Sequence, residues 1–383
     1  FFLIMISDDE AEGLKVEYRY HYDSVNSIPD VESYTEKGEY HDQWESVRKR
    51  CFLLAAMVSF FALCGGSAYL PAMPDAQASL GASDFEISMT LIGPNIVLAF
   101  GPLFVGPLSD RFGRRLLYVL LIGYIGSLLI CAASLGIWML VIGRTMSYVF
   151  CCGFTSIATA IIAEIYPPAK RATAIGTLML PSFLGSILIP PISGVAVQFF
   201  GWRSAYWIIA IPAMIGFFLV FFFLPETVNY STKKRSLNPV STIAIIFKYP
   251  LLGLIFCNGF TFVAMLMMSA NFSIIISQYY PYGAALIGLM YMPYGIGCLL
   301  GAFAGGRIAD RMKKEFGIGG LALTHVIFAT ITGFSVLLFG WSVRSFPVVA
   351  VCALLLASFG GISSRSTIVA TGVHFNPTAA AAT

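Results

Sequence analysis

The chain alternates between apolar stretches of about twenty residues and short polar connectors, and a helix of that length crosses roughly 30 Å of hydrocarbon at 1.5 Å per residue. The pattern predicts an all-α membrane protein with ten spans. We place the spans near residues 51–70, 87–108, 116–135, 138–164, 173–200, 205–224, 251–277, 284–305, 319–340 and 346–367.

The connectors between the spans alternate in charge, which predicts their orientation. One set carries sixteen Lys and Arg residues, and the other carries only Arg203 and Arg344. Cytoplasmic connectors are enriched in bases, so we assign the basic set and the N-terminal tail to the cytosol. The polar stretch 225–250 is a cytoplasmic linker that separates six spans from four.

Composition supports a membrane protein, because 57% of the residues are hydrophobic, 11% are charged and the mean hydropathy is +0.80. The acids are unevenly placed: twelve of the twenty lie between Asp8 and Glu45, against three bases. Residues 1–50 are therefore predicted to form an acidic, disordered cytoplasmic tail. The eight cysteines lie in or beside apolar runs without metal-binding spacing, so we expect them to be free thiols and expect no metal site.

In each half of the chain, before and after the linker, a charged motif follows the second span of that half. It reads Gly106-Pro-Leu-Ser-Asp-Arg-Phe-Gly-Arg-Arg115 in the first half and Gly306-Arg-Ile-Ala-Asp-Arg311 in the second. A solvated charge cluster that only sets topology would explain one copy, but two copies in register favour an internal duplication. We expect two pseudo-symmetric halves: residues 51–224 with six spans, and residues 251–383 with four. Residues 376–383 resemble the start of an eleventh helix, which predicts that the second half is incomplete.

These motifs resemble the major facilitator superfamily and, within it, the fungal drug:proton antiporters of twelve spans, the multidrug and polyamine exporter group. The likeness covers residues 50–380. In this superfamily the motif is a cytoplasmic latch whose Asp faces a helix N-terminus, where the helix dipole favours an anion. The resemblance implies that Asp110 meets the eleventh helix and that Asp310 meets the fifth. The implied latch residues are Gly106, Asp110, Arg111, Gly113, Arg114 and Arg115 in the first half, and Gly306, Asp310 and Arg311 in the second.

The fifth span resembles the antiporter motif of that family. Four positions match, namely Gly176, Gly185, Pro190 and Gly194. Ile189 and Ser193 stand where the family has glycines. The resemblance implies a bent, tightly packed helix that seals leak paths between rocking halves; ordinary packing of small residues is the alternative.

The fourth span carries Arg144 in a segment that resembles a family motif whose Arg is implicated in proton transfer. Ser147-Tyr148 replaces the Gln-Gly of that motif. An Arg within a span costs about 2.5 to 3.5 kcal/mol on insertion scales, so we expect it to face a wet cavity or a partner. A purely structural hydrogen bond between helices is the alternative. No carboxylate lies deep in a span, which leaves Asp84 and Glu86 as candidates for proton coupling, unless that group lies in the missing helices.

Other polar residues within the spans could line a central cavity or form hydrogen bonds between helices. They are Asn95, Asn258, Asn271, Gln278 and His325. Met265 and Phe262 suit a deformable apolar pocket, and core packing or contact with lipid is the alternative.

The chain contains no phosphate-binding loop, no His-Glu-x-x-His and no nucleophile elbow, so we expect no enzymatic activity. The resemblance implies a monomeric, proton-coupled exporter of amphipathic or cationic small molecules that works by alternating access. It would need no cofactor beyond the proton gradient, bind no nucleic acid, and lie in the plasma membrane or the vacuolar membrane. A facilitator or importer of a polar nutrient is one alternative, and a membrane protein that transports nothing is another.

Overall fold

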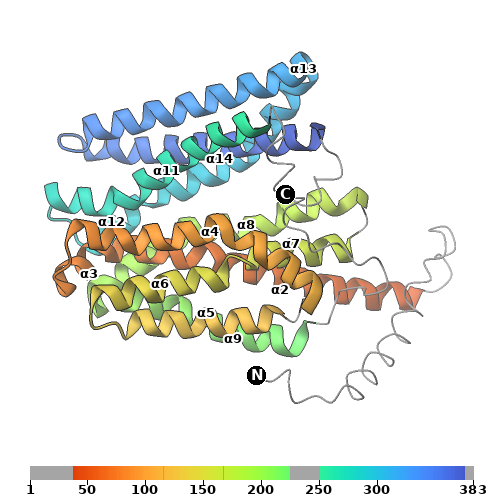
Figure 1. Ribbon diagram of the computed structural model, residues 1–383, viewed down its shortest axis with the longest axis horizontal. Helices are drawn as coiled ribbons and strands as arrows, with labels where there is room; N and C mark the ends of the chain where they lie inside the picture. Colours follow the sequence, from red (N-terminus) through yellow and green to blue (C-terminus); the bar gives the residue numbers. More distant parts are fainter. Residues whose placement is uncertain (1–37, 115, 167, 225–250, 376–383) are drawn as a thin grey trace. The chain divides into compact units, whose positions relative to one another are not determined.

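A computed structural model describes residues 38–114, 116–166, 168–224 and 251–375 of the chain (Figure 1). The backbone alone is described for residues 38–47, 168–173, 251–255 and 365–375 and for residues 63, 103, 106, 107, 110, 111, 163, 164, 257 and 318. The acidic tail up to residue 37, Arg115, the linker 225–250 and the predicted helix start at 376–383 lie outside the described residues.

Internal contacts divide the chain into two units, Phe1–Lys49 and Arg50–Thr383. The described part of the first unit belongs to helix α2 (Gly38–Tyr69). Residues 38–50, which the sequence analysis placed in a disordered tail, are therefore helical. These residues form a helix for a local reason, because the stretch is rich in Glu, Gln, Lys and Arg, which have high helix propensity.

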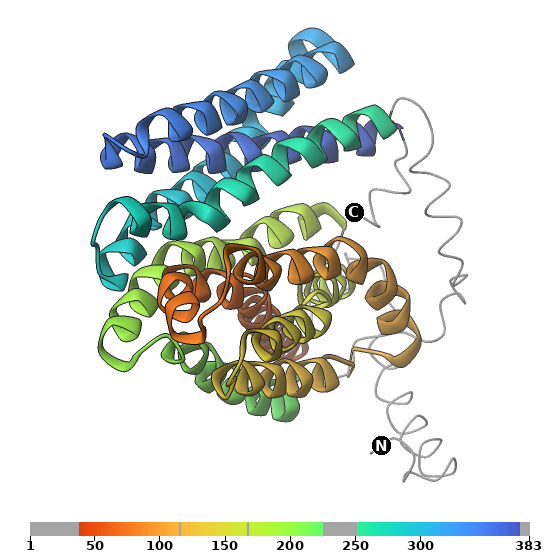
Figure 2. The same cartoon turned by 60° about the vertical axis from the view of Figure 1, so that its left-hand side comes forward.

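The second unit begins with the remaining helices of the first half, seen together in Figure 2. These are η3 (Leu70–Ala72), α3 (Met73–Leu80), α4 (Asp84–Phe112), α5 (Leu116–Ala132), α6 (Ile137–Cys151), α7 (Phe154–Ile165), α8 (Pro168–Phe200) and α9 (Ser204–Phe223). The predicted fourth span thus consists of two helices, α6 and α7. Helix α8 contains Pro181, Pro190 and Pro191, each of which removes a backbone hydrogen bond from the helix interior.

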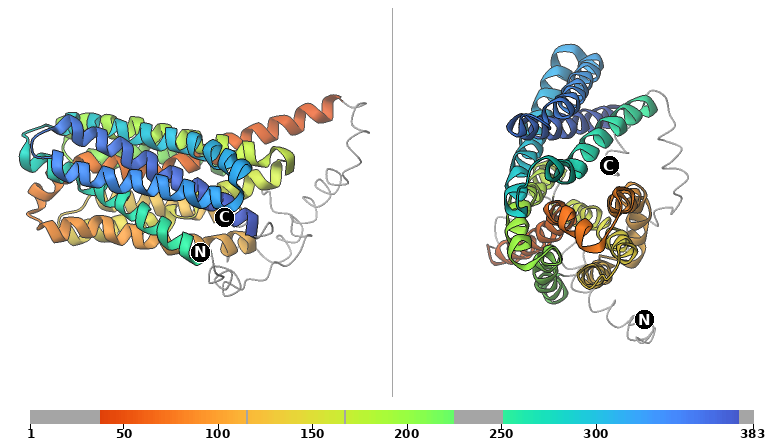
Figure 3. Two further views of the ribbon diagram at one scale, coloured as in Figure 1. Left: turned by 90° about the horizontal axis from the view of Figure 1, so that it is seen from above. Right: turned by 90° about the vertical axis from the view of Figure 1, so that its left-hand side faces the viewer.

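The second half consists of α11 (Leu251–Tyr279), α12 (Ala284–Met290), α13 (Met292–Ser342) and α14 (Pro347–Phe375). Helix α13 contains most of the predicted eighth span and all of the ninth. The chain folds back within it at Gly317, whose φ of 62° lies in the left-handed region that glycine tolerates. Figure 3 shows the helices of this half, drawn in turquoise to dark blue, packed side by side.

Nine helical stretches among the described residues are long and apolar enough to cross a membrane, and the shorter apolar helix Leu116–Ala132 is a further candidate. Together they account for the ten predicted spans. The prediction of an all-α membrane protein is confirmed. The pseudo-twofold relation between the halves stays a prediction.

Local sequence signals explain where α4 begins and ends. Its N-cap Ser83 accepts a hydrogen bond from the backbone N–H of Glu86, whose carboxylate accepts one from the backbone N–H of Ser83 at 3.0 Å. This capping box satisfies two backbone donors that a helix start leaves unpaired. The helix ends at Gly113, whose φ is 80°.

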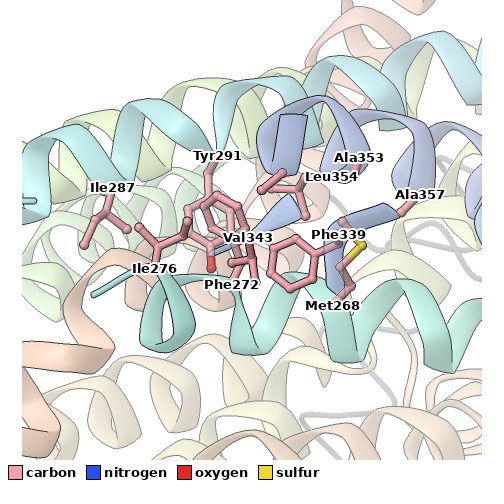
Figure 4. Close-up of a cluster of buried hydrophobic side chains, with 11 residues drawn as sticks. Met268, Phe272, Ile276, Ile287, Tyr291, Phe339, Val343, Ala353, Leu354 and Ala357 are labelled. Carbon is pink, nitrogen blue, oxygen red and sulfur yellow. The ribbon is translucent and has the colours of Figure 1, made fainter. Parts of the chain in front are cut away.

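The core of the second half is apolar and aromatic (Figure 4). The Phe272 ring of α11 meets the Tyr291 ring edge-on at 5.2 Å between centroids, and Phe339 of α13 lies 5.9 Å from Phe272. The Tyr291 hydroxyl donates a hydrogen bond to the Ser269 carbonyl at 2.7 Å. Such paired aromatic rings with a satisfied hydroxyl hold α11 against the neighbouring spans.

We name the helix ends that the charge pattern places away from the cytosol the outer ends; they include Tyr69, Ser83, Phe200 and Ala284. The two halves meet through α8 and α12 near these ends. The Gln198 side chain of α8 accepts a hydrogen bond from the backbone N–H of Ala285 at 3.3 Å. This contact lies at the first turn of α12, where backbone donors have no partner within the helix.

Candidate functional site

Arg144 of α6 lies inside the first half and is only 2% exposed. Its Nε donates a hydrogen bond to the Thr90 carbonyl of α4 at 2.8 Å. Its guanidinium carbon lies 4.0 Å from the centre of the Tyr69 ring of α2. Tyr148 and Tyr206 are close enough to interact with the guanidinium electrostatically. Residues from α2, α4, α6 and α9 therefore converge on one buried positive charge.

No carboxylate among the described residues forms an ion pair with Arg144. The charge is instead stabilised by the Thr90 carbonyl oxygen, by the Tyr69 ring and by the nearby Tyr148 and Tyr206. A cation over a desolvated aromatic ring gains about 2 kcal/mol or more. The sequence predicted either a wet cavity or a partner for Arg144, and the structure supplies a partner.

Two buried polar groups lie beside the residues that surround Arg144. The Tyr206 ring stacks on Tyr69 at 5.9 Å and meets Trp202 edge-on at 6.4 Å. The Tyr206 hydroxyl interacts with the Arg144 guanidinium, and within the described part of the chain the Trp202 Nε1 has no hydrogen-bond partner. Buried polar atoms of this kind are sites where ordered water fits. Tyr69, Thr90 and Tyr206 carry no signal in the sequence, because each is an ordinary span residue until the fold brings it to Arg144.

Two glycines of the predicted antiporter motif lie where α8 closely approaches another helix. A Cβ at Gly185 would lie 2.5 Å from the Cys64 sulfur of α2, and one at Gly194 would collide with the Ala284 carbonyl of α12. Around Gly176, no atom of the described residues lies within 4 Å of the position of a Cβ. Ser193, where the family has a glycine, donates a hydrogen bond to the Ala68 carbonyl at 2.6 Å.

The second half supplies matching glycines that the sequence analysis missed. A Cβ at Gly288 would collide with the Pro190 carbonyl of α8, and one at Gly295 would lie 2.6 Å from the Ile187 nitrogen. We name the contact of Gly194, Gly288 and Gly295 with the opposing backbone the glycine seam. Small residues allow backbones of two helices to approach closely within a membrane.

The first latch motif ends α4. Gly106, Asp110 and Arg111 lie in its last turns, and their side chains are outside the described part. Arg114 is buried, and its Nη1 donates a hydrogen bond to the Ser109 hydroxyl. Gly113, with a φ of 80°, lets the chain leave the helix. The role of Asp110 as a latch stays a prediction.

The second latch motif differs, because it lies within a continuing helix. Asp310 is exposed, and Arg311 pairs with Glu315 one turn further on, at 3.2 Å. The helix runs about two turns beyond Asp310 before the chain folds back at Gly317. A Cβ at Gly306 would meet no atom of the described residues within 4 Å, so none of them requires a glycine there for close packing.

The predicted cavity residues of α11 mostly contact their own bundle. Asn271 donates a hydrogen bond to the Met267 carbonyl of its own helix at 2.8 Å. Met265 is buried, and a Cβ at Gly361 of α14 would lie 2.6 Å from its sulfur. Phe262 is half-buried. Asn258 accepts a hydrogen bond from the Ser364 hydroxyl of α14 at 3.2 Å.

The candidate carboxylates at the start of α4 have structural contacts. Glu86 forms the capping box with Ser83, and Asp84 accepts a hydrogen bond from the Gln77 amide at 2.7 Å. Asp84 is exposed and Glu86 is half-buried. They therefore lie at an outer end and not beside Arg144.

The sequence model of the Major Facilitator Superfamily matches residues 55–383, so the chain belongs to this superfamily. Among its relatives, the MFS antiporter QDR2 of Candida albicans is 22% identical, over 76% of this chain and 69% of that protein. The multidrug transporter AQR1 of Candida glabrata is 26% identical, over 72% of this chain and 52% of that protein.

A solved structure has the same fold. It is a bacterial homologue of the human lysosomal transporter Spinster, in an inward-facing and occupied conformation, with a TM-score of 0.69 and 15% identity. The match covers 88% of this chain and 76% of that one. The chain spans about half the length of several curated relatives: 58% and 46% of two fungal MFS-type transporters and 52% of AQR1.

Proposed function

We propose that this multi-pass membrane protein is a transporter that exports amphipathic or cationic small molecules in exchange for protons. The observation that carries the proposal is the glycine seam, which joins the antiporter-like helix α8 to α12 and α13 of the other half. The relatives named as an antiporter and a multidrug transporter support export. A plasma-membrane location and a monomeric state belong to the same proposal.

Alternating access requires a contact between the halves that seals one side and can separate again. The glycine seam meets this requirement near the outer ends, because backbone lies against backbone without interlocked side chains. When the seam closes, a substrate bound between the halves has access to the cytosol. When it separates, the same site opens outward.

Arg144 contributes a fixed positive charge to this cycle. A guanidinium keeps its proton at every physiological pH, so Arg144 cannot itself carry the transported proton. It acts electrostatically on neighbouring groups and links α2, α4 and α6 through Thr90 and Tyr69. In this proposal it keeps those helices together as the half moves.

The experiment reconstitutes the chain in proteoliposomes and follows a fluorescent cationic dye. An imposed pH gradient, with the acidic side facing the outer ends, is expected to drive the dye toward that side, and a protonophore should stop the movement. Dye movement that is unchanged by the protonophore would instead support a facilitator. If neither the pH gradient nor a concentration gradient of the dye itself moves the dye, the proposed function is wrong.

A further inference from the structure

An open groove lies on the second half near its outer ends, and we name it the lateral groove. Its volume is about 330 Å³, at the lower end of the range of ligand sites. Val348 is 74% exposed and Leu289 is 48% exposed, so the groove is open to its surroundings. The lining is apolar and aromatic, and it consists of Tyr282, Leu289, Met290, Pro347, Val348 and Val351.

The depth of the lateral groove places it against the outer leaflet of the membrane. Leu289 follows the start of α12 by five residues, and Val351 follows the start of α14 by four, so both lie roughly 6 to 8 Å below the outer ends. Near the same ends, the exposed rings of Trp341 and Phe346 stack at 6.0 Å between centroids. Aromatic side chains gather where the hydrocarbon meets the headgroups. The groove therefore lies just inside that boundary.

A positive charge lies near the groove and is connected to it through two tyrosines. Tyr282 stacks on Tyr280 at 5.2 Å, and the Tyr280 hydroxyl donates a hydrogen bond to the Arg344 carbonyl at 2.9 Å. The exposed Arg344 guanidinium lies 5.5 Å from the centre of the Tyr279 ring. Among the described residues, Arg344 forms no ion pair. The two connectors that carry these residues contain no Asp or Glu, so this outer surface is positive.

We propose that the lateral groove binds a phospholipid of the outer leaflet. One acyl chain lies between α12 and α14, and the phosphate lies beside the Arg344 guanidinium. The planar guanidinium presents several donors and suits a phosphate, while the apolar lining suits the chain. A cationic substrate would be repelled by Arg344, so the charge favours a lipid over the substrate of the exporter. The inference goes beyond the proposed function, and it does not depend on proton coupling.

A bound chain would have a structural consequence for the second half. Met290 and Val351 of the groove pack against the buried core that contains Ile287 and Leu354 (Figure 4). A chain in the groove would cover that side of the core and hold α12 against α14. Because α12 also carries Gly288 of the glycine seam, an occupied groove supports the helix that closes the outer side.

The test uses a phosphatidylcholine with a photoactivatable acyl chain. The full chain is held in micelles of an uncharged alkyl maltoside, so that no other phosphate competes, and crosslinks are mapped to peptides after irradiation. They should concentrate in the first turns of α12 and α14. Arg344→Gln should raise the half-saturating lipid concentration about fivefold, as expected for one charge near a membrane surface. Arg344→Lys should stay close to the unsubstituted chain, because the charge survives.

Arg203→Gln is the matched control for the charge. Arg203 is the other base on the outer side, but it donates to the Ser134 carbonyl at 2.8 Å and lies over the Trp202 ring, in the first half. This variant should leave the crosslinks unchanged. Val351→Trp fills the groove and should remove the crosslinks, whereas Val119→Trp, at an exposed valine of α5, should not. If Val351→Trp does not fold, the exposed Arg344 variants still decide the question.

Three results would each overturn the inference. Crosslinks spread evenly over the spans would show that the groove has no preference for lipid. An unchanged half-saturating concentration in Arg344→Gln, or equal labelling by a diacylglycerol with the same chain, would show that the phosphate is not recognised. Loss of the crosslinks in an excess of the cationic dye would assign the groove to the transported substrate instead.

Discussion

At the scale of single residues, Arg144 is held by unlike partners: a carbonyl oxygen on one side and an aromatic ring on the other. The two contacts use different atoms of the guanidinium, since Nε donates to the carbonyl and the central carbon lies over the Tyr69 ring. An ammonium group lacks both the fixed donor geometry and the flat face. The site therefore selects Arg over Lys by shape as well as by charge.

Replacement of Arg144 tests this selection. Arg144→Ala should abolish pH-driven efflux, because the buried charge and both contacts are lost. Arg144→Lys should retain part of it, since the charge survives without the flat stack on Tyr69. Initial efflux rates at equal protein content measure the effect. Unchanged efflux in the alanine variant would remove Arg144 from the mechanism.

Ser193 provides a second test at the scale of the residue. Its hydroxyl joins α8 to the Ala68 carbonyl of α2 across 2.6 Å. Ser193→Ala should lower the free energy of unfolding by about 0.6 kcal/mol, the average measured for hydrogen bonds between membrane helices. Ser204→Ala is the control, because the exposed Ser204 hydroxyl bonds within its own turn, to the Gly201 carbonyl. Unfolding in detergent compares the two, and equal losses would contradict a special role for Ser193.

At the scale of helices, glycines decide which pairs come close. The seam glycines bring α8 to α12 and α13, while Gly297, Gly301 and Gly305 of α13 bring that helix to α14, where a Cβ would meet backbone or serine atoms. Without a hydrophobic force between helices in lipid, such close van der Waals contact supplies much of the association. The glycines are therefore contact positions, and their spacing sets which helix face is used.

The seam can be tested with a pair of alanine substitutions. Gly288→Ala places a Cβ against the Pro190 carbonyl, so it should hold the outer ends apart. The readout is labelling of an introduced Ala285→Cys by a membrane-impermeant thiol reagent, in a chain whose native cysteines have been replaced. Labelling should rise in Gly288→Ala.

Gly176→Ala is the matched control for the seam, since no atom in the described part of the chain lies within 4 Å of the position of its Cβ. It should leave the labelling rate unchanged from that of the chain with glycine at both positions. Equal labelling in Gly288→Ala and Gly176→Ala would show that the seam does not control access from the outer side.

At the scale of the whole molecule, the two latch motifs occupy different structural contexts. The first ends a helix at Gly113, whereas the second lies within a helix that continues to Gly317. The two motifs thus share their charged residues but differ in where the chain turns. In the second copy, Arg311 forms its ion pair within its own helix, with Glu315.

The latch predicts a separation of folding from transport. Asp110→Asn should cripple transport, because it removes the charge that the family resemblance places opposite a helix N-terminus. Membrane insertion should persist, since no apolar span changes. Efflux and membrane abundance are measured in parallel, and Leu108→Ala, an exposed apolar change in the same turn, serves as the control. Equal losses of abundance and efflux would show that Asp110 is structural.

Much of the fold follows from the sequence alone, because lipid leaves the backbone few choices. Every N–H and C=O must be paired within a span, so an apolar stretch of sufficient length becomes a helix. The same reasoning singled out Arg144, since a charge within a span requires a partner. It did not predict that α2 begins at Gly38, because a polar stretch with high helix propensity carries no hydropathy signal.

Only the tertiary structure decided which residues face one another. Thr90 lies 54 positions from Arg144, and Ser193 lies 125 from Ala68. A span that is apolar all round has no polar face to reveal its rotation, so the sequence cannot tell which side of a helix meets its neighbour. Packing sets that rotation, and it thereby placed Arg144 on Tyr69, Gly288 on Pro190 and His325 beside Ser364.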